Sequence, residues 1–145
     1  MKARFDFYQA SPDTMKAMFA TQKVIQATGL EHRLVELVKI RASQINGCAF
    51  CMHMHAADAR QHGIPDHVLD TVAGWPEAPW FSDREKAALA WTERLTRLSE
   101  PADDRHDYDR LATHFNEKER TDLTYVIGVI NMWNRFSVGF RREPE

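Results

Sequence analysis

The sequence predicts an all-α fold, and three observations support this prediction. Apolar residues recur at helical spacing through most of the 145-residue chain. Capping residues stand where these periodic stretches begin and end, and no stretch shows the alternation of a half-buried strand. With 43% hydrophobic and 28% charged residues, the chain is long enough to bury a sizeable core. We therefore expect a single domain, residues 1–145, of six or seven helices.

The first half of the chain divides into three predicted helices, over residues 12–28, 31–46 and 48–62. Ser11 and Pro12 fit the cap and the first turn of the first helix. Gly47 suits the left-handed residue that closes one helix just before the next begins. Because only this short break separates the second and third helices, we expect them to fold back on each other as an antiparallel hairpin.

The second half adds four predicted helices, over residues 65–74, 82–98, 108–116 and 117–140. The first of them begins at Pro65 and ends at Gly74, and a proline-containing connector follows it. Ser82 and Glu85 form a capping-box pattern that marks the start of the next helix. The last helix begins with acidic residues, which favour a helix N-terminus, and carries apolar residues at helical spacing.

Composition and charge exclude several classes of protein. The net charge is −2, and basic residues are interleaved with acidic ones, so neither a nucleic-acid partner nor an anionic membrane surface is expected. Residues 1–9 lack the apolar core of a signal peptide or a membrane span. We therefore expect a cytoplasmic protein, in which two close cysteines are redox-active or metal-binding more often than structural.

Both cysteines of the chain, Cys48 and Cys51, fall in the first turn of the third predicted helix. Residues three apart on a helix have Cβ atoms roughly 5–6 Å apart, which allows a disulfide after modest local adjustment. The unpaired N–H groups at a helix start also stabilise a thiolate. The spacing therefore predicts a dithiol that opens and closes.

Two further residues are predicted to lie beside these sulfurs. His55 is four residues after Cys51 and shares its helix face, so the imidazole can exchange a proton with the sulfur. In the predicted hairpin, Glu36 precedes the turn by about as many residues as His55 follows it, so the two residues lie opposite each other. A carboxylate there would orient the imidazole, as in other activated nucleophiles. His53 points away from this face.

The pattern Glu36-x11-Cys48-x2-Cys51-x3-His55 resembles the signature of the alkylhydroperoxidase D (AhpD)-like branch of the carboxymuconolactone decarboxylase family. The segment Asn131-Met132-Trp133-Asn134-Arg135 resembles the Asn-x-Trp-Asn-Arg segment common in that branch. The likeness covers roughly residues 15–140. The best-characterised peroxidases of this type carry a histidine just before the second cysteine, where this chain has Phe50.

The resemblance implies an all-helical thiol peroxidase that assembles as a homo-oligomer, a trimer or a hexamer. It implies that Cys51 attacks the hydroperoxide, that Cys48 resolves the product, and that Glu36 and His55 form the proton relay. An external dithiol, such as a dihydrolipoyl protein, would reduce the disulfide. No metal or other cofactor is implied.

Several alternatives stay open at this point. The helix dipole favours Cys48 as the more acidic thiol, whereas the nearby imidazole favours Cys51. We select Cys51 as the attacking cysteine, because the alkoxide that leaves the hydroperoxide also needs a proton from that imidazole. Zinc binding by the cysteines and inert packing are the other readings of the CxxC motif. A redox sensor without turnover, or a γ-carboxymuconolactone decarboxylase, are the alternative functions. The remaining histidines are expected at the surface or at caps: His32, His62, His67, His106 and His114.

Overall fold

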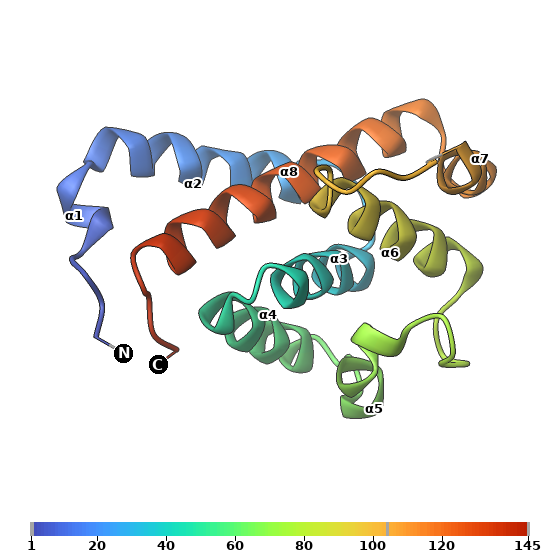
Figure 1. Cartoon of the computed structure of the whole chain (residues 1–145), viewed down its shortest axis with the longest axis horizontal. Helices are drawn as coiled ribbons and strands as arrows, with labels where there is room; N and C mark the ends of the chain where they lie inside the picture. The colour runs from blue at the N-terminus through green and yellow to red at the C-terminus, as the bar shows by residue number, and fades with distance from the viewer. Residues whose placement is uncertain (1, 104, 145) are drawn as a thin grey trace.

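The computed structural model describes residues 2–103 and 105–144. These residues form eight α-helices and one short 3-10 helix, with no strand among them (Figure 1). The elements are α1 (Phe7–Ala10), α2 (Pro12–Ala27), α3 (His32–Ile45), α4 (Ala49–Gln61), α5 (Asp66–Asp70), η1 (Val72–Gly74), α6 (Asp83–Thr96), α7 (Arg105–His114) and α8 (Glu117–Gly139). The predicted all-α fold and the central helix hairpin are confirmed.

Helix α3 lies at the centre of the fold, between α4 on one side and α6 and α8 on the other (Figure 1). Leu34 and Val38 belong to the apolar cluster that α3 forms with α6, α7 and α8. Leu37 and Ile40 belong to a second cluster with residues of α4, α5, η1 and α6. Because α3 is packed on several sides, its buried side chains are held in fixed positions.

The helix count is higher than predicted because of α1. In this four-residue helix the Asp6 carboxylate caps the first turn by accepting from the Tyr8 N–H at 2.9 Å. A single turn is too short to show a helical period, so the sequence pattern gave no signal for it.

Three of the predicted helices have different bounds in the structure. The helix predicted over 108–116 begins earlier, at Arg105, and ends at His114. The helix predicted over 65–74 is divided into α5 and η1, with Thr71 between them. Helix α6 ends at Thr96, and Leu98 beyond it is 67% exposed rather than packed. The predicted capping box of Ser82 and Glu85 is confirmed. A second capping box, of Asn116 and Glu119, starts α8 and was not identified from the sequence.

The turn between α3 and α4 is a tight helix stop. Gly47 has φ +65°, the left-handed conformation predicted for it. The Cys48 N–H donates to the Ser43 carbonyl at 2.9 Å, and the Gly47 N–H donates to the Gln44 carbonyl at 3.3 Å. These two bonds form a Schellman motif, which satisfies the last carbonyls of α3 while Cys48 already caps α4.

A polar network fastens this turn to α8. The Asn46 side-chain amide donates to the side-chain oxygens of Asn131 at 3.0 Å and of Asn134 at 2.9 Å. Asn134, which is 1% exposed, donates in turn to the Ser43 hydroxyl at 3.0 Å. Asn131 and Asn134 therefore tie α8 to the end of α3. Arg135 hydrogen-bonds to Asn131 of its own helix.

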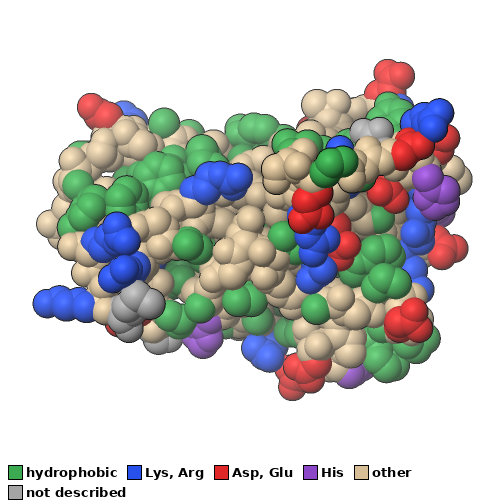
Figure 2. Space-filling model, in the orientation of Figure 1, with side chains coloured by type: hydrophobic (Ala, Val, Ile, Leu, Met, Phe, Trp, Pro, Cys, Tyr) green, Lys and Arg blue, Asp and Glu red, His purple; other side chains and the backbone are tan. Residues whose placement is uncertain are grey.

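The helices show no membrane-spanning character. Among the described residues, none of them combines the length and the apolar composition that a bilayer-crossing helix requires. Over α6 and α7, basic side chains lie among acidic ones on the face shown in Figure 2. Hydrophobic side chains gather instead over α2 and α8, at the end of the molecule where both termini lie (Figures 1 and 2).

Candidate redox site at the start of helix α4

Cys48 and Cys51 are joined by a disulfide, with their Cα atoms 5.3 Å apart. Cys48 is the N-cap of α4 rather than part of its first turn, because its φ and ψ are extended. Its sulfur accepts a hydrogen bond from the Cys51 N–H at 3.3 Å. When the disulfide is reduced, this donor and the positive end of the helix dipole stabilise a thiolate on Cys48.

Glu36 and His55 are hydrogen-bonded across the hairpin, as the predicted register requires. The distance from His55 Nδ1 to Glu36 Oε2 is 2.9 Å, and both residues are buried. Because an ionised carboxylate only accepts, Nδ1 carries the proton of this bond. In the neutral imidazole the lone pair is then on Nε2, which is the atom available as a base.

Lys39 is a third member of this buried cluster that sequence reasoning missed. Its ammonium donates to Glu36 Oε1 at 3.0 Å, and the residue is 8% exposed. Burial opposes ionisation of Glu36, but the hydrogen bond and charge of His55, together with the Lys39 ammonium, outweigh it and lower the pKa of Glu36 to about 2. The i, i+3 spacing of Glu36 and Lys39 on one helix was the available signal.

A pocket of about 420 Å³ opens beside Cys51 and His55. Most of its lining is apolar and includes Phe19, Phe50 and Trp133. Within the described residues the buried Trp133 Nε1–H has no hydrogen-bond partner. Cys51 and His55 therefore lie together in the lining of a largely apolar pocket.

A second, smaller pocket of about 260 Å³ opens beside Cys48. It is lined by Gly47 and by residues from the end of α8 and the segment after it, including Ser137 and Arg141. Cys51 thus belongs to the lining of one pocket and Cys48 to the lining of the other.

Arg142 stands between these pockets and lines both of them. Its guanidinium lies 3.9 Å from the ring centroid of Phe50 and 4.7 Å from that of Tyr8, in cation–π contact with each ring. The Arg142 guanidinium also donates to the Tyr8 hydroxyl. Nothing in the sequence pattern indicated that this arginine, close to the end of the chain, folds back onto the CxxC motif.

The other histidines lie away from the sulfurs. His53 is exposed, as its place on the helix predicted. The remaining five are exposed or half-buried, which confirms the expected surface positions: His32, His62, His67, His106 and His114. His32 and His62, however, lie against each other, with ring centroids 4.0 Å apart.

The low pKa of Glu36 predicts a loss of stability in acid. A carboxyl whose pKa falls on folding stabilises the fold above its unfolded pKa, 4.5, and this contribution is lost as the pH falls toward about 2. We expect this carboxyl to account for roughly 3 kcal/mol of the free energy of unfolding lost over that range.

Urea unfolding at pH 6, 4 and 2.5 measures this loss of free energy of unfolding. Glu36→Gln should flatten the pH dependence, whereas Glu77→Gln at an exposed site should leave it as in the wild type. Equal pH dependence in all three proteins would contradict the assignment.

Comparison with known proteins extends these observations. A model of the carboxymuconolactone decarboxylase family matches residues 12–94, a region that contains all four predicted site residues. The uncharacterised protein YdfG of Bacillus subtilis (strain 168) is 36% identical over 138 residues, which cover 95% of this chain and 94% of YdfG.

Two further similarities involve AhpD proteins. The crystal structure of ATU0492 from Agrobacterium tumefaciens has a TM-score of 0.96 at 38% identity and covers 99% of both chains. That protein is described as being of unknown function and is provisionally assigned to antioxidant defence as an AhpD protein. The alkyl hydroperoxide reductase AhpD of Rhizorhabdus wittichii is 38% identical over 50 residues, which cover 34% of this chain and 29% of that protein.

Proposed function

The chain belongs to the carboxymuconolactone decarboxylase family and is AhpD-like, and from this premise we propose that it is a thiol peroxidase that reduces hydroperoxides. One observation carries the proposal. Cys51, half of a closed disulfide, shares an apolar pocket with His55, whose Nδ1 is held by the buried carboxylate of Glu36. Nucleophile, base and orienting group are thus arranged around a space where a substrate fits.

The first step is attack by the Cys51 thiolate on the hydroperoxide. His55 takes the proton of the Cys51 thiol through Nε2, and the thiolate attacks the terminal oxygen of the O–O bond. The S–O bond forms as the O–O bond breaks, and Cys51 becomes a sulfenic acid. The leaving alkoxide takes from His55 the proton that came from the Cys51 thiol, and departs as an alcohol.

The second step closes the disulfide. The Cys48 thiol gives up its proton to solvent at the cap of α4, and its thiolate attacks the sulfenic sulfur of Cys51. The S–S bond forms as the S–O bond breaks, and the hydroxide takes up a proton from solvent and leaves as water. In this scheme the helix start and the imidazole, which favoured different cysteines as the more reactive thiol, each have a separate role. The dipole and the Cys51 N–H act on the resolving sulfur, and the imidazole acts on the peroxidatic sulfur.

An external dithiol completes the cycle. Its thiolate attacks one sulfur of the disulfide, which gives a mixed disulfide and frees the other protein cysteine. Its second thiol then attacks the mixed disulfide, releases the remaining protein cysteine and leaves the external dithiol oxidised to a disulfide. The separate pocket beside Cys48 supports attack at that sulfur. Such an attack frees Cys51 next to His55, ready for the next hydroperoxide.

The walls of the Cys51 pocket favour an organic hydroperoxide over hydrogen peroxide. Phe19, Phe50 and Trp133 offer apolar contacts to a hydrocarbon body. Phe50, at the place of the histidine in other peroxidases of this type, adds to the apolar wall, so the proton relay we propose rests on Glu36 and His55 alone.

A coupled assay tests the proposed function. The purified protein should consume cumene hydroperoxide in the presence of dihydrolipoamide, faster than it consumes hydrogen peroxide at equal concentration. Each hydroperoxide consumed should oxidise one dithiol to its disulfide. A disulfide that forms and is reduced without catalytic turnover would instead favour the redox-sensor alternative.

The assembly and the partners stay predictions. Exposed apolar side chains at Phe5, Phe19 and Val24 support the trimer or hexamer that the resemblance implies, and light scattering in solution measures the oligomer size directly. A monomer at micromolar concentration would contradict it.

A further inference from the structure

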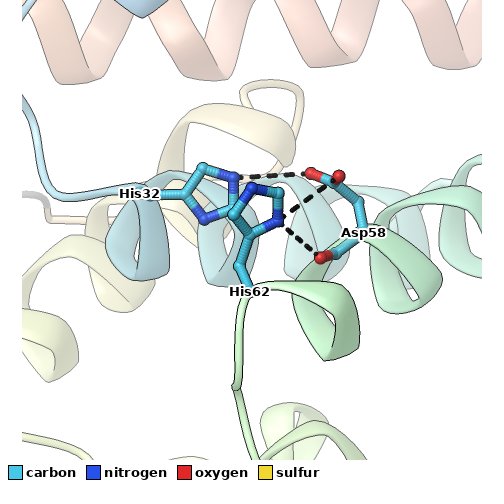
Figure 3. Close-up of side chains that lie close together, drawn as sticks. All are labelled: His32, Asp58 and His62. Carbon is cyan, nitrogen blue, oxygen red and sulfur yellow. Dashed lines mark hydrogen bonds and ion pairs between the residues drawn. The ribbon is translucent and has the colours of Figure 1, made fainter.

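A second cluster of chemically active side chains lies at the other end of the α3–α4 hairpin from the Gly47 turn. His32 is the first residue of α3, Asp58 lies in the last turn of α4, and His62 is the C-cap of α4. Figure 3 shows the two imidazole rings lying against each other and facing the Asp58 side chain. The proposed redox chemistry uses none of these residues.

The distance between His32 and Asp58 fits shared coordination better than a direct hydrogen bond. His32 Nε2 lies 3.4 Å from Asp58 Oδ2. Good N–H···O bonds are about 2.7–3.2 Å long. Ligand atoms about 2.0–2.2 Å from a tetrahedral zinc ion are separated by about 3.3–3.6 Å. One ligand atom from each of the three residues lies within 4.8 Å of the others.

A backbone hydrogen bond fixes the orientation of His62. Its Nδ1 lies 2.9 Å from the Asp58 carbonyl oxygen, and because a carbonyl only accepts, this nitrogen carries the proton. The lone pair of the neutral ring is then on Nε2, which lies on the side of His32 in Figure 3. A hydrogen bond from one ring nitrogen to a backbone carbonyl is a common way to orient a metal-binding histidine.

We propose that His32, Asp58 and His62 bind one divalent transition-metal ion, with Zn²⁺ as the expected ion. Two imidazoles and one carboxylate suit zinc, whereas Mg²⁺ and Ca²⁺ require more oxygen ligands. The half-exposed position leaves room for water to complete the coordination. The C-terminal end of α4 adds the negative end of its dipole, which favours a cation.

Such an ion would clamp the hairpin that carries the redox residues. His32 comes from α3, while Asp58 and His62 are four apart on one face of α4. The metal would join the two helices at the end where no turn connects them. Binding to the folded chain alone raises its stability by mass action.

The test uses tag-free protein in its disulfide form, so that the cysteines do not bind zinc. Equilibrium dialysis against ZnCl₂, followed by elemental analysis, should give one zinc ion per chain. At a zinc concentration about 100 times the Kd, the melting temperature should rise by roughly 5 °C or more. MgCl₂ at the same concentration should give no such rise.

Matched variants locate the ion. The variants His32→Ala and His62→Ala should each lose the bound zinc and the rise in melting temperature. The variant His53→Ala, which changes an exposed histidine of α4, should keep both. Melting curves without zinc show that each variant is folded. The proposal is overturned if the wild type takes up no zinc, if the site variants bind it as well as the wild type does, or if MgCl₂ stabilises the protein equally.

Discussion

Replacing Cys51 by serine should abolish the dithiol-dependent reduction of cumene hydroperoxide, with a loss of at least about 10³-fold in kcat/KM. A serine hydroxyl cannot form the thiolate that attacks the O–O bond, nor can it pass through a sulfenic acid to a disulfide. The two residues differ by one atom at a buried position, so the fold should persist. The measurement is the rate of the coupled assay, with circular dichroism as the check on folding.

The Cys48→Ser variant is the control that separates the two sulfurs. It retains the attacking thiol but cannot close the disulfide, so it should complete one turnover and stop. Mass spectrometry after treatment with hydroperoxide should find a gain of one oxygen on Cys51. Turnover that survives in Cys51→Ser, or a sulfenic acid trapped on Cys48 in that variant, would reverse the assigned roles.

Replacing His55 by glutamine should lower kcat/KM by about 10²–10⁴-fold at neutral pH, which is the usual contribution of a general acid–base group. The change removes the base and leaves the buried pair of Glu36 and Lys39 in place. The wild-type rate should depend on the protonation of the imidazole, whereas the variant should lose this dependence. Stopped-flow measurements from pH 5 to pH 9 compare the two profiles.

His53→Gln is the matched control for this variant, because it makes the same change two residues away on the exposed side of α4. Its rate should stay within twofold of the wild-type rate. If the His55 variant keeps the wild-type rate and pH profile, the proton relay we propose is wrong, although the thiol chemistry of Cys51 could still operate without it.

The helix hairpin could be predicted because local rules and long-range packing agree there. Gly47 carries the left-handed conformation that the turn needs, and the antiparallel register then places Glu36 against His55. The short α1 could not be predicted, since one turn has no period and its stability depends on contacts made by Phe7 with Phe136 and Phe140 of the C-terminal region.

The parts of the site that the sequence did not reveal depend on the path of the chain in space. Arg142 reaches Phe50 only because the segment after α8 folds back across the start of α4. The His32 and Asp58 pair, in contrast, follows from the same register as Glu36 and His55. It was overlooked because exposed histidines at helix ends have an ordinary explanation as caps.

The Schellman turn and the Asn46–Asn134 bond hold the CxxC motif in place throughout the proposed redox cycle. Backbone and amide bonds that do not involve sulfur hold the peptide carrying Cys48. Breaking the S–S bond therefore leaves the two thiols close to each other, and no loop has to refold before the disulfide forms again. We expect the reorganisation between oxidised and reduced protein to be small, so encounters with hydroperoxide and dithiol would set the turnover rate.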